Sequence, residues 1–499
     1  MVKYAELTNQ NPWWKYGKGY QRFDKEMTEL TNQIIKVERK PLEPQQGEMS
    51  IIRGCRQIGK TTYLKQLISK LIDQEKNPDA IMYLSVDRLI KTRRELRNAI
   101  AEFMRRNMDT EQVYILLDEI TALKDWNQEL KTMSDSGATQ KAKILVTGSS
   151  GAALRNTGEQ LPGRGLEGNE YYIKPLTFRE FITNTIDFFI AHSDAGELTE
   201  ALKRLNTILP TAIINNNDDI PQIVKTCEKT LPFQEELMYL FNHYLKSGGF
   251  PVSINSYLEP LASKKPPLID QSVAENFVRI TLGALSDYGK NETTARQLLD
   301  EILTKYGTMF SFTSLSDEVN HVTTGDYLDY LEKSFILHIH YAIDLNKKKP
   351  KYKGRKKVYF QDPFIYYSIK SWLTGMSIND TITETLDNEI LLSEIIEGIV
   401  TSNLVINSEE PYMREKNTFN WFYYDNSGRE IDNIIKIKDD YDAIEVKYRN
   451  NVTLKDATKT QGLRQTIVLS KDDFITSDDA CVIPVSIYLS LLERSLKNL

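Results

Sequence analysis

The sequence predicts an α/β fold, and two observations lead to that prediction. Between Met49 and about Pro175, short β-rich apolar runs (SIIRG, AIMYLSV, VYILLD, KILVTGS and YYIKPL) alternate with helical segments. Strands that alternate with helices are typical of a parallel sheet. Near the C-terminus, a helix is followed by the β-rich runs FNWFYY, REIDNIIKI, YDAIEVKY and TIVLS, which predict a second, smaller α/β domain.

The 499 residues suggest roughly three domains at about 150 residues each, and the patterning divides them into five segments. The segments are a polar and aromatic N-terminal segment (1–47), the parallel-sheet core (48–175), a helical segment (176–291), helices and β-runs around a basic stretch (292–372), and the C-terminal α/β segment (373–499).

The composition is that of a globular protein. Hydrophobic residues make up 40% and charged residues 26%, which excludes collagen-like and disordered classes. No stretch approaches the roughly 18 apolar residues of a membrane helix, and the N-terminus has no apolar signal region. Three cysteines lie far apart and are odd in number, which is typical of reduced thiols. We therefore expect a cytoplasmic protein without a membrane partner.

A phosphate-binding motif stands at the start of the core. GCRQIGKT at 54–61 fits G-x-x-x-x-G-K-[ST] and lies between an apolar run and a helical pattern, which makes a chance match in a turn the weaker interpretation. Lys60 is expected to contact the β- and γ-phosphates, and Thr61 to ligate Mg²⁺. The expected ATP-binding residues are Gly54, Cys55, Arg56, Gln57, Ile58, Gly59, Lys60, Thr61 and Thr62.

An acid pair ends the next apolar strand, VYILLDE. Asp118 is expected to hold Mg²⁺, and Glu119 to deprotonate the attacking water. The alternative is an acid pair that simply ends a strand on the surface. The pair favours a hydrolase over a transferase and weakens a further alternative, a small-metabolite kinase.

Two further catalytic candidates follow the strand KILVTGSS. Ser149 is the better candidate to touch the γ-phosphate or the attacking water, and Thr147 is the second. Arg164 lies in the glycine-rich run LPGRGLE, from which it can reach a neighbouring subunit's nucleotide as an arginine finger. On that interpretation the protein is a homo-oligomer; the alternative is a solvated surface arginine.

These motifs resemble the AAA-type ATPases of the archaeal ATPase group. The resemblance rests on GCRQIGKTT, YILLDEI, LVTGSS and LPGRGLE…YYIKPLTFREF, with NPWW, SGGFP, KVYFQDPF and REID…AIEVKY elsewhere, and so spans nearly the whole chain. It implies an additional-strand P-loop core, a helical lid over 176–291 and a winged-helix region over 292–372. It also implies a PD-(D/E)xK restriction-nuclease-like domain over 373–499. The sequence departs from the group at Tyr63, where an aliphatic residue is usual.

An acid–lysine constellation lies in the last segment. Glu445 and Lys447 are two apart on a predicted strand and share a face, and Asp432 lies on the preceding strand of a predicted hairpin. Asp432 and Glu445 are expected to share a divalent ion, with Lys447 positioning a water or stabilising charge. Glu397 is an added ligand and Glu430 an alternative one. A helix over 454–463 is expected next. E-x-K is also a common charge pair on a solvated strand face.

The basic stretch KKKPKYKGRKK at 347–357 has eight positive residues and no negative one, in a chain whose net charge is −6. Short helices precede it and β-like runs flank it, which is winged-helix order with the stretch as the wing. A basic wing can lie along a phosphate backbone and bind nucleic acid without reading its sequence. The alternative is a solvated lysine loop.

Two functions from different classes fit these features. The first is an ATP- and Mg²⁺-dependent AAA-type ATPase that acts on nucleic acid, with DNA expected, and whose C-terminal domain either cleaves DNA or only binds it. The second is a nucleotide-switched regulatory or binding protein with an inactive nuclease-like domain.

Overall fold

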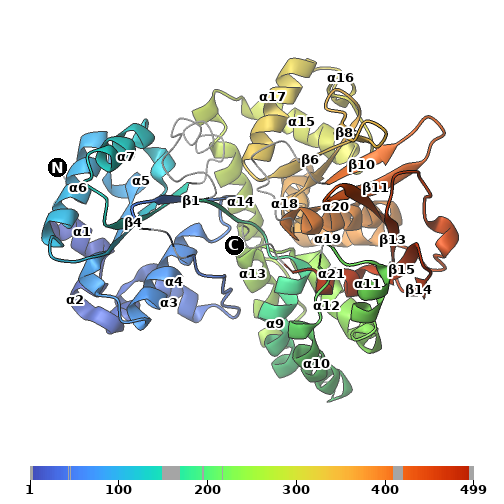
Figure 1. Cartoon of the computed structure of the whole chain (residues 1–499), viewed down its shortest axis with the longest axis horizontal. Coiled ribbons are helices and arrows are strands. Elements are labelled where there is room, and N and C mark those ends of the chain that lie inside the picture. The colour runs from blue at the N-terminus through green and yellow to red at the C-terminus, as the bar shows by residue number, and fades with distance from the viewer. Residues whose placement is uncertain are drawn as a thin grey trace. The chain divides into compact units, whose positions relative to one another are not determined.

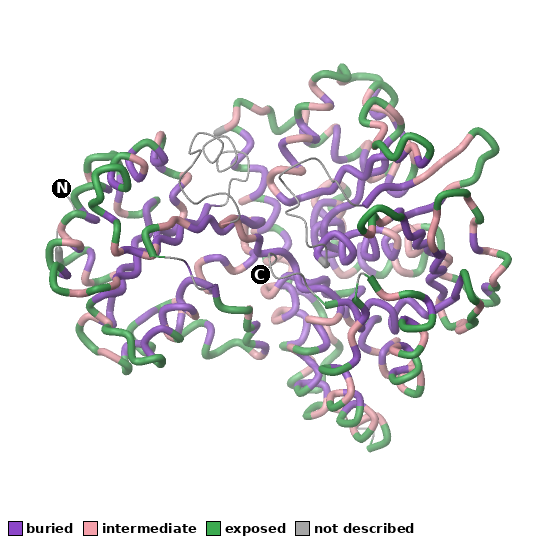
Figure 2. Tube along the Cα trace, in the orientation of Figure 1, coloured by how far each residue is buried: buried purple, intermediate pink, exposed green. Residues whose placement is uncertain are grey.

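The computed structural model describes residues 4–42, 44, 46–148, 169–193, 196–215, 217–407 and 420–493. The chain forms two compact units. The first takes in the chain up to Lys174 together with Lys333–Phe335, and the second takes in Pro175–Glu332 and the chain that follows Phe335. The strands of the main sheet in each unit are largely buried (Figures 1 and 2).

A five-stranded parallel sheet forms the centre of the first unit. Its strands are β1 (Met49–Gly54), β2 (Ile81–Ser85), β3 (Val113–Asp118), β4 (Ala142–Gly148) and β5 (Glu170–Ile173). Their order is β2-β3-β4-β1-β5, and every neighbouring pair is parallel. The predicted α/β fold with a parallel sheet is therefore confirmed.

Helices cover both faces of this sheet (Figure 1). They are α4 (Lys60–Asp73) on one face, and α5 (Val86–Leu89), α6 (Arg93–Arg106) and α7 (Trp126–Asp135) on the other. Alternate strand residues such as Ile115 and Leu117 pack against Ile100 and Phe103 of α6 in one apolar core. Because the strands carry apolar residues on both faces, they read as near-continuous hydrophobic runs.

The N-terminal segment packs on the edge strand β2. It contains α1 (Tyr4–Gln10), α2 (Trp13–Tyr16) and α3 (Lys25–Asn32). The indole N–H groups of Trp13 and Trp14 both donate to the carbonyl oxygen of Ile81, each at 2.8 Å. The aromatic cluster thereby covers an exposed sheet edge, which otherwise presents unpaired backbone groups.

Helices make up a large part of the second unit. These are α9 (Phe178–His192), α10 (Gly196–Ile208), α11 (Ile220–Cys227), α12 (Gln234–Ser247), α13 (Pro251–Ala262), α14 (Gln271–Gly283), α15 (Glu292–Thr304), α16 (Phe312–Leu315), α17 (His321–Lys333), α18 (Pro363–Thr374), α19 (Ile378–Asp387), α20 (Glu389–Asn407) and α21 (Val485–Leu491). Among the residues that the structure describes, no helix is both long and apolar enough to cross a membrane.

The motifs SGGFP and QDPF meet inside this unit. The buried carboxylate of Asp362 accepts hydrogen bonds from the backbone N–H groups of Gly249 (2.7 Å) and Phe364 (2.9 Å). Gly248 has a φ of +65°, and a Cβ there would lie 2.2 Å from Asp362 Oδ1. Burial raises the pKa of Asp362 to about 7. The two motifs therefore join α12 to the start of α18 and have a structural role.

Two small sheets and one large sheet complete the second unit. The small ones pair β6 (Leu337–Tyr341) with β9 (Lys356–Phe360), and β7 (Ile343–Asp344) with β8 (Lys349–Pro350). The large sheet has the order β10-β11-β12-β13-β15-β14. Its strands are β10 (Asn420–Tyr424), β11 (Glu430–Ile437), β12 (Asp440–Lys447), β13 (Gln465–Ser470), β14 (Ile475–Thr476) and β15 (Ala480–Pro484).

The predicted hairpin of β11 and β12 is confirmed, but the predicted helix over 454–463 is wrong. Only a short 3₁₀ turn, Leu454–Asp456, forms there. Thr458 donates its backbone N–H and its hydroxyl to the carboxylate of Glu445, at 2.6 and 2.9 Å. These side-chain bonds replace the backbone bonds that a continuing helix would make.

Candidate functional site

The predicted phosphate-binding loop connects the end of β1 to the start of α4. Gln57 and Gly59 have φ angles of +60° and +97°, a region that glycine occupies without strain. A Cβ at Gly54 would lie 2.4 Å from the carbonyl oxygen of Ile173 on β5. Both glycines of the motif are therefore required by the backbone, one for its angle and one for close packing.

Lys60 is folded back into this loop. Its ammonium donates to the carbonyl oxygens of Gly54 (3.1 Å) and Cys55 (2.9 Å), and the residue is 5% exposed. Burial lowers the pKa of Lys60, and the negative charge of Glu119 opposes that shift most strongly. A phosphate oxygen is a better partner for this ammonium than a carbonyl oxygen. The loop therefore fits the phosphates of a nucleoside triphosphate.

Asp118 lies at the centre of a hydroxyl cluster at the carboxyl ends of the strands. Its Oδ2 accepts from Thr61 Oγ1 (2.7 Å) and from the Tyr83 hydroxyl (2.8 Å), and its Oδ1 accepts from Thr147 Oγ1 (2.5 Å). Asp118 is 2% exposed. The predicted Mg²⁺ residues Thr61 and Asp118 are thus in direct contact. Hard oxygen donors of this kind fit Mg²⁺ together with nucleotide phosphates.

Glu119 follows at the end of β3. Its φ is +51° and its backbone N–H donates to Thr147 Oγ1 at 3.1 Å. The residue is half-buried. The negative charge of Glu119 raises the pKa of Lys60, so the predicted base lies close enough to the predicted phosphate-binding lysine to act on its charge.

Sequence reasoning ranked Ser149 above Thr147 and placed Arg164 as an arginine finger. Ser149 and Arg164 lie outside the described residues. Thr147 contacts both the carboxylate of Asp118 and the backbone of Glu119. Tyr83 was not predicted from the sequence, where it is one tyrosine in the strand AIMYLSV. The strand order, which pairs β2 with β3, is needed to place it beside Asp118.

The C-terminal acids gather around a lysine that was expected elsewhere. Lys357, from the predicted basic wing, lies on β9 and is 3% exposed. Its ammonium is 2.7 Å from Glu397 Oε1 on α20 and 3.7 Å from Asp432 Oδ1, and it contacts the carboxylate of Glu430. Burial opposes the charge on Lys357, but the carboxylates of Glu397, Asp432 and Glu430 outweigh it and raise the pKa above its usual range.

Glu397 is partly buried, with 15% of its side chain exposed. Burial, with the charge of Asp432, raises the pKa of Glu397 to about 7, while Lys357 and Tyr359 act in the opposite direction. Tyr359 donates its hydroxyl to the same carboxylate oxygen that Lys357 contacts. Glu397 therefore has a cation and a hydroxyl as partners.

The remaining members of the predicted constellation lie nearby. Asp432 Oδ2 accepts from the backbone N–H of Val446 at 2.8 Å. Glu445 is fully buried, and Lys447 Nζ lies 3.7 Å from its Oε2. Burial raises the pKa of Glu445, and the charge of Asp432 adds to that shift. Asp432, Glu445 and Lys447 are thus neighbours, as the hairpin register requires.

This arrangement does not fit the divalent ion expected at Asp432, Glu445 and Glu397. Within the described ranges, no group of three or more His, Cys, Asp or Glu residues is placed to hold a metal. Mg²⁺ needs carboxylate oxygens and keeps several waters. Here the Lys357 ammonium lies among the carboxylates that would ligate it, and Thr458 holds Glu445.

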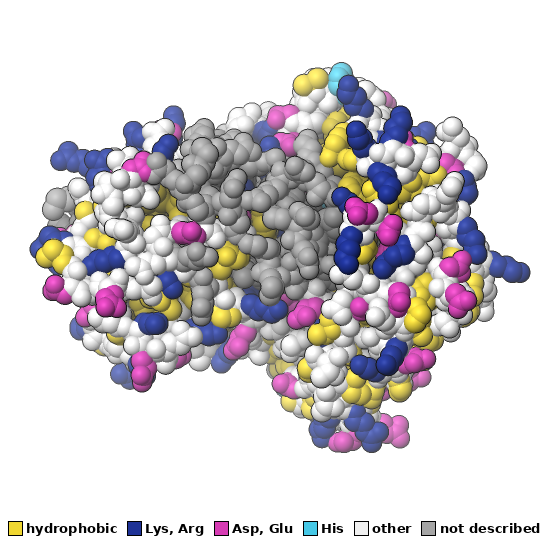
Figure 3. All heavy atoms as spheres, in the orientation of Figure 1, with side chains coloured by type: hydrophobic (Ala, Val, Ile, Leu, Met, Phe, Trp, Pro, Cys, Tyr) yellow, Lys and Arg dark blue, Asp and Glu magenta, His cyan; other side chains and the backbone are white. Residues whose placement is uncertain are grey.

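The basic stretch is partly buried. Lys356 and Lys357 lie inside β9, and Lys356 Nζ is 4.4 Å from the ring centroid of Phe312. Lys347, Lys348, Lys349, Lys353 and Arg355 are exposed. On the face drawn in Figure 3, Lys and Arg side chains lie over the region of β8 and β10. These exposed residues are the part of the predicted wing that a nucleic acid could contact.

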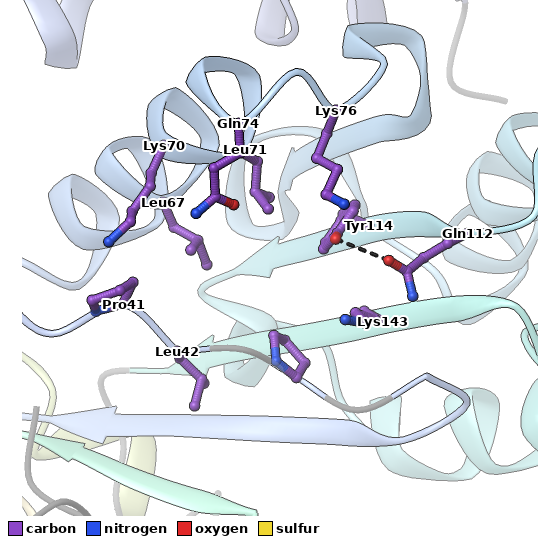
Figure 4. A pocket seen from close by; sticks show the side chains of 11 residues that line it. Pro41, Leu42, Leu67, Lys70, Leu71, Gln74, Lys76, Gln112, Tyr114 and Lys143 are labelled. Carbon is purple, nitrogen blue, oxygen red and sulfur yellow. Dashed lines mark hydrogen bonds between the residues drawn. The ribbon is translucent and has the colours of Figure 1, made fainter.

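A pocket of about 140 Å³ lies beside the C-terminal half of α4 (Figure 4). Leu67 and Leu71 of α4 and Tyr114 of β3 contribute to its wall. It includes none of the predicted site residues, so we do not assign it to nucleotide binding.

Family models match three parts of the chain. Residues 46–182 match an AAA domain. Residues 238–376 match a domain of unknown function, DUF8612, and residues 393–488 match another, DUF4143. The last two matches carry no functional description, so the winged-helix and nuclease-like assignments stay predictions.

Relatives and solved structures are similar at low identity. An uncharacterised protein of Methanocaldococcus jannaschii is 26% identical over 322 residues, which are 63% of this chain and 62% of the relative. The Orc1 protein of Aeropyrum pernix, solved in complex with DNA, is 12% identical with a TM-score of 0.25, over 65% of this chain and 86% of that one. A RuvB variant of Thermotoga maritima is 15% identical with a TM-score of 0.26, over 71% of this chain and 91% of that one.

The class of the first unit follows from its own features. The five-stranded parallel sheet and the motif 54–61 between β1 and α4 are those of a P-loop ATPase core, and residues 46–182 match an AAA domain.

Proposed function

We propose that the protein is a Mg²⁺-dependent ATPase that binds ATP at the loop 54–61. The observation that carries this proposal is the direct contact of Thr61 with Asp118, beside a lysine that is already buried in the loop. The backbone N–H groups of the loop and the N-terminus of α4 bind the phosphates. Lys60 exchanges its two carbonyl partners for phosphate oxygens.

Thr61 and Asp118 are the residues that would hold Mg²⁺, directly or through water. When bound, the ion neutralises charge on the phosphate oxygens. Glu119 takes the proton of the attacking water. Thr147 keeps both acids in place, because its hydroxyl donates to Asp118 and accepts from the backbone of Glu119.

The experiment compares ATP hydrolysis by the full chain with that of Lys60→Ala and Glu119→Gln. Lys70→Ala is a matched control, because Lys70 lies on the same helix with an exposed side chain. Loss of activity in both site variants, with the control unchanged, supports the proposal. Full activity in Lys60→Ala contradicts it.

Arg164 is proposed to stabilise charge in the transition state of a neighbouring subunit. Arg164→Ala should then slow hydrolysis more than it weakens ATP binding. Mixing it with Lys60→Ala subunits should restore part of the activity, since each variant supplies what the other lacks. A strictly monomeric protein would exclude this arrangement.

We propose that the second unit acts on nucleic acid through the exposed residues of the basic stretch. Five positive side chains on one short segment, near the exposed Tyr352, supply charge that can follow a phosphate backbone. DNA is the polymer expected. Stimulation of ATP hydrolysis by DNA or RNA supports this proposal, and its absence favours a nucleotide-switched regulatory protein.

The contacts of Lys357 favour binding over cleavage for the C-terminal domain. A lysine ammonium does not activate water as a metal ion does, and here it neutralises the acids that cleavage would need. We therefore propose that this domain binds without cleaving. Incubating the full chain with DNA and Mg²⁺ tests this, and cleavage that disappears in Asp432→Ala would contradict it.

A further inference from the structure

The N-terminal segment bonds the backbone of β2 at three residues along its outer edge, Ile81, Tyr83 and Ser85. Trp13 and Trp14 both bind the carbonyl oxygen of Ile81. The side chain of Asn11 accepts from the backbone N–H of Tyr83 (2.6 Å) and donates to its carbonyl oxygen (2.9 Å). A side-chain amide that bonds both groups of one residue replaces the missing neighbouring strand, so this edge strand cannot slide or fray freely.

A buried ion pair fixes the ring of Tyr83. Lys65 of α4 and Asp24, the N-cap of α3, are 2.7 Å apart, and both side chains are 3% exposed. Lys65 Nζ lies 3.8 Å from the ring centroid of Tyr83 and 5.1 Å from that of Trp13. A desolvated cation over an aromatic face is a favourable contact. The N-terminal segment therefore positions the ring of Tyr83 through the ion pair of Asp24 with Lys65.

The hydroxyl of Tyr83 donates to Asp118 Oδ2 at 2.8 Å. Burial, reinforced by the charge of Asp118, raises the pKa of Tyr83 far above its usual value, so the phenol stays a neutral donor. The contacts run from Asp24 through Lys65 and Tyr83 to Asp118. All of them lie within the first unit.

We propose that Tyr83 is a positioning residue for Asp118, held in place by the N-terminal segment 4–32. This inference rests on the proposed function, in which Asp118 supports Mg²⁺ beside the nucleotide. Mg²⁺ demands near-ideal geometry, so a carboxylate that rotates binds it less well. Residues that orient metal ligands typically change metal affinity or activity by about 10–100-fold when they are replaced.

Tyr83→Phe tests this directly, because it removes the hydroxyl and keeps the ring that Lys65 contacts. Tyr114→Phe is the matched control: Tyr114 is a buried tyrosine on the neighbouring strand β3, and its hydroxyl bonds Gln112. The measurement is the Mg²⁺ concentration that half-maximally supports binding of a fluorescent ATP analogue by the full chain. We expect it to rise about tenfold in Tyr83→Phe and to stay unchanged in the control.

A second variant tests the link to the N-terminal segment. Lys65→Met keeps the length of the side chain but loses the ammonium, and it should raise the Mg²⁺ requirement in the same direction. In the double variant with Tyr83→Phe the two effects should not add, because both act through the same hydroxyl.

Three results decide the proposal. An unchanged Mg²⁺ requirement in Tyr83→Phe, or an equal shift in Tyr114→Phe, overturns it while nucleotide binding by the wild type still stands. A wild type that binds the analogue without any Mg²⁺ dependence overturns both this inference and the proposed role of Asp118. A rise in the Mg²⁺ requirement in Tyr83→Phe and in Lys65→Met, but not in Tyr114→Phe, supports it.

Discussion

The ammonium of Lys357 lies 2.7 Å from Oε1 of Glu397, and both side chains are largely buried. One residue comes from a strand in the basic stretch and the other from α20, 40 positions later. The contact ties β9 to the C-terminal sheet domain and places a fixed cation among its acids.

Replacing Lys357 by Met should destabilise the second unit. The variant leaves Glu397, Glu430 and Asp432 close together without their cation, and breaking a buried ion pair costs about 3–5 kcal/mol. Chemical denaturation of the full chain measures this loss, with Lys353→Met as the exposed control. A change below about 1 kcal/mol would show that solvent screens the acids.

Stability should fall as the pH rises through the range in which Glu397 titrates. The pKa of Glu397 is raised from 4.5 to about 7, so above about 4.5 the unfolded chain releases its proton first. The folded state then holds more protons than the unfolded state, and unfolding becomes easier up to about pH 7. Asp362 shifts in the same direction.

Glu397→Gln should flatten this decline, since an amide does not titrate, and leave the part that Asp362 causes. The difference should be on the order of 3 kcal/mol between the two pH limits. The free energy of unfolding, measured at a series of pH values, provides the comparison. Identical pH profiles for the wild type and the variant would exclude the shift.

The exposed part of the basic stretch should set the salt dependence of nucleic-acid binding. Replacing Lys347, Lys348, Lys349, Lys353 and Arg355 by Gln should weaken binding about equally for all sequences. It should reduce the slope of log affinity against log salt by about 0.9 for each lost contact with duplex DNA. Lys356 and Lys357 are not replaced in this variant, because both are buried. An unaltered slope would identify a solvated loop.

Lys447→Ala and Asp432→Ala should leave ATP hydrolysis intact, since neither residue belongs to the first unit. We expect no Mg²⁺-dependent cleavage of nucleic acid by the wild type or by either variant. Gel analysis of labelled DNA and RNA with Mg²⁺ checks this. Cleavage by the wild type that both variants lose would contradict this expectation and support the predicted metal site.

Local sequence signals were sufficient to predict the strands of the first unit and its phosphate-binding loop. Its strands are continuous apolar runs, and the loop 54–61 has a motif whose glycines the backbone requires. Asp118 could be placed because it ends such a run. Its contact with Tyr83 could not, because only the strand order brings β2 beside β3.

The second unit shows where sequence reasoning fails. Lys357 looked like one more exposed lysine, yet pairing of β9 with β6 buries it against acids that follow 40 to 75 positions later. The expected helix over 454–463 is absent because Thr458 bonds Glu445. Both outcomes depend on contacts between distant segments, which no local pattern encodes.

The most direct test is ATP binding and hydrolysis by Glu119→Gln beside the wild type. An amide cannot accept the proton of the attacking water, while the loop and Lys60 still bind the phosphates. We predict that the variant binds Mg²⁺-ATP as the wild type does and hydrolyses it at least about 100-fold more slowly, the lower limit of a general-base contribution. Wild-type turnover by Glu119→Gln would contradict the assignment of the catalytic base.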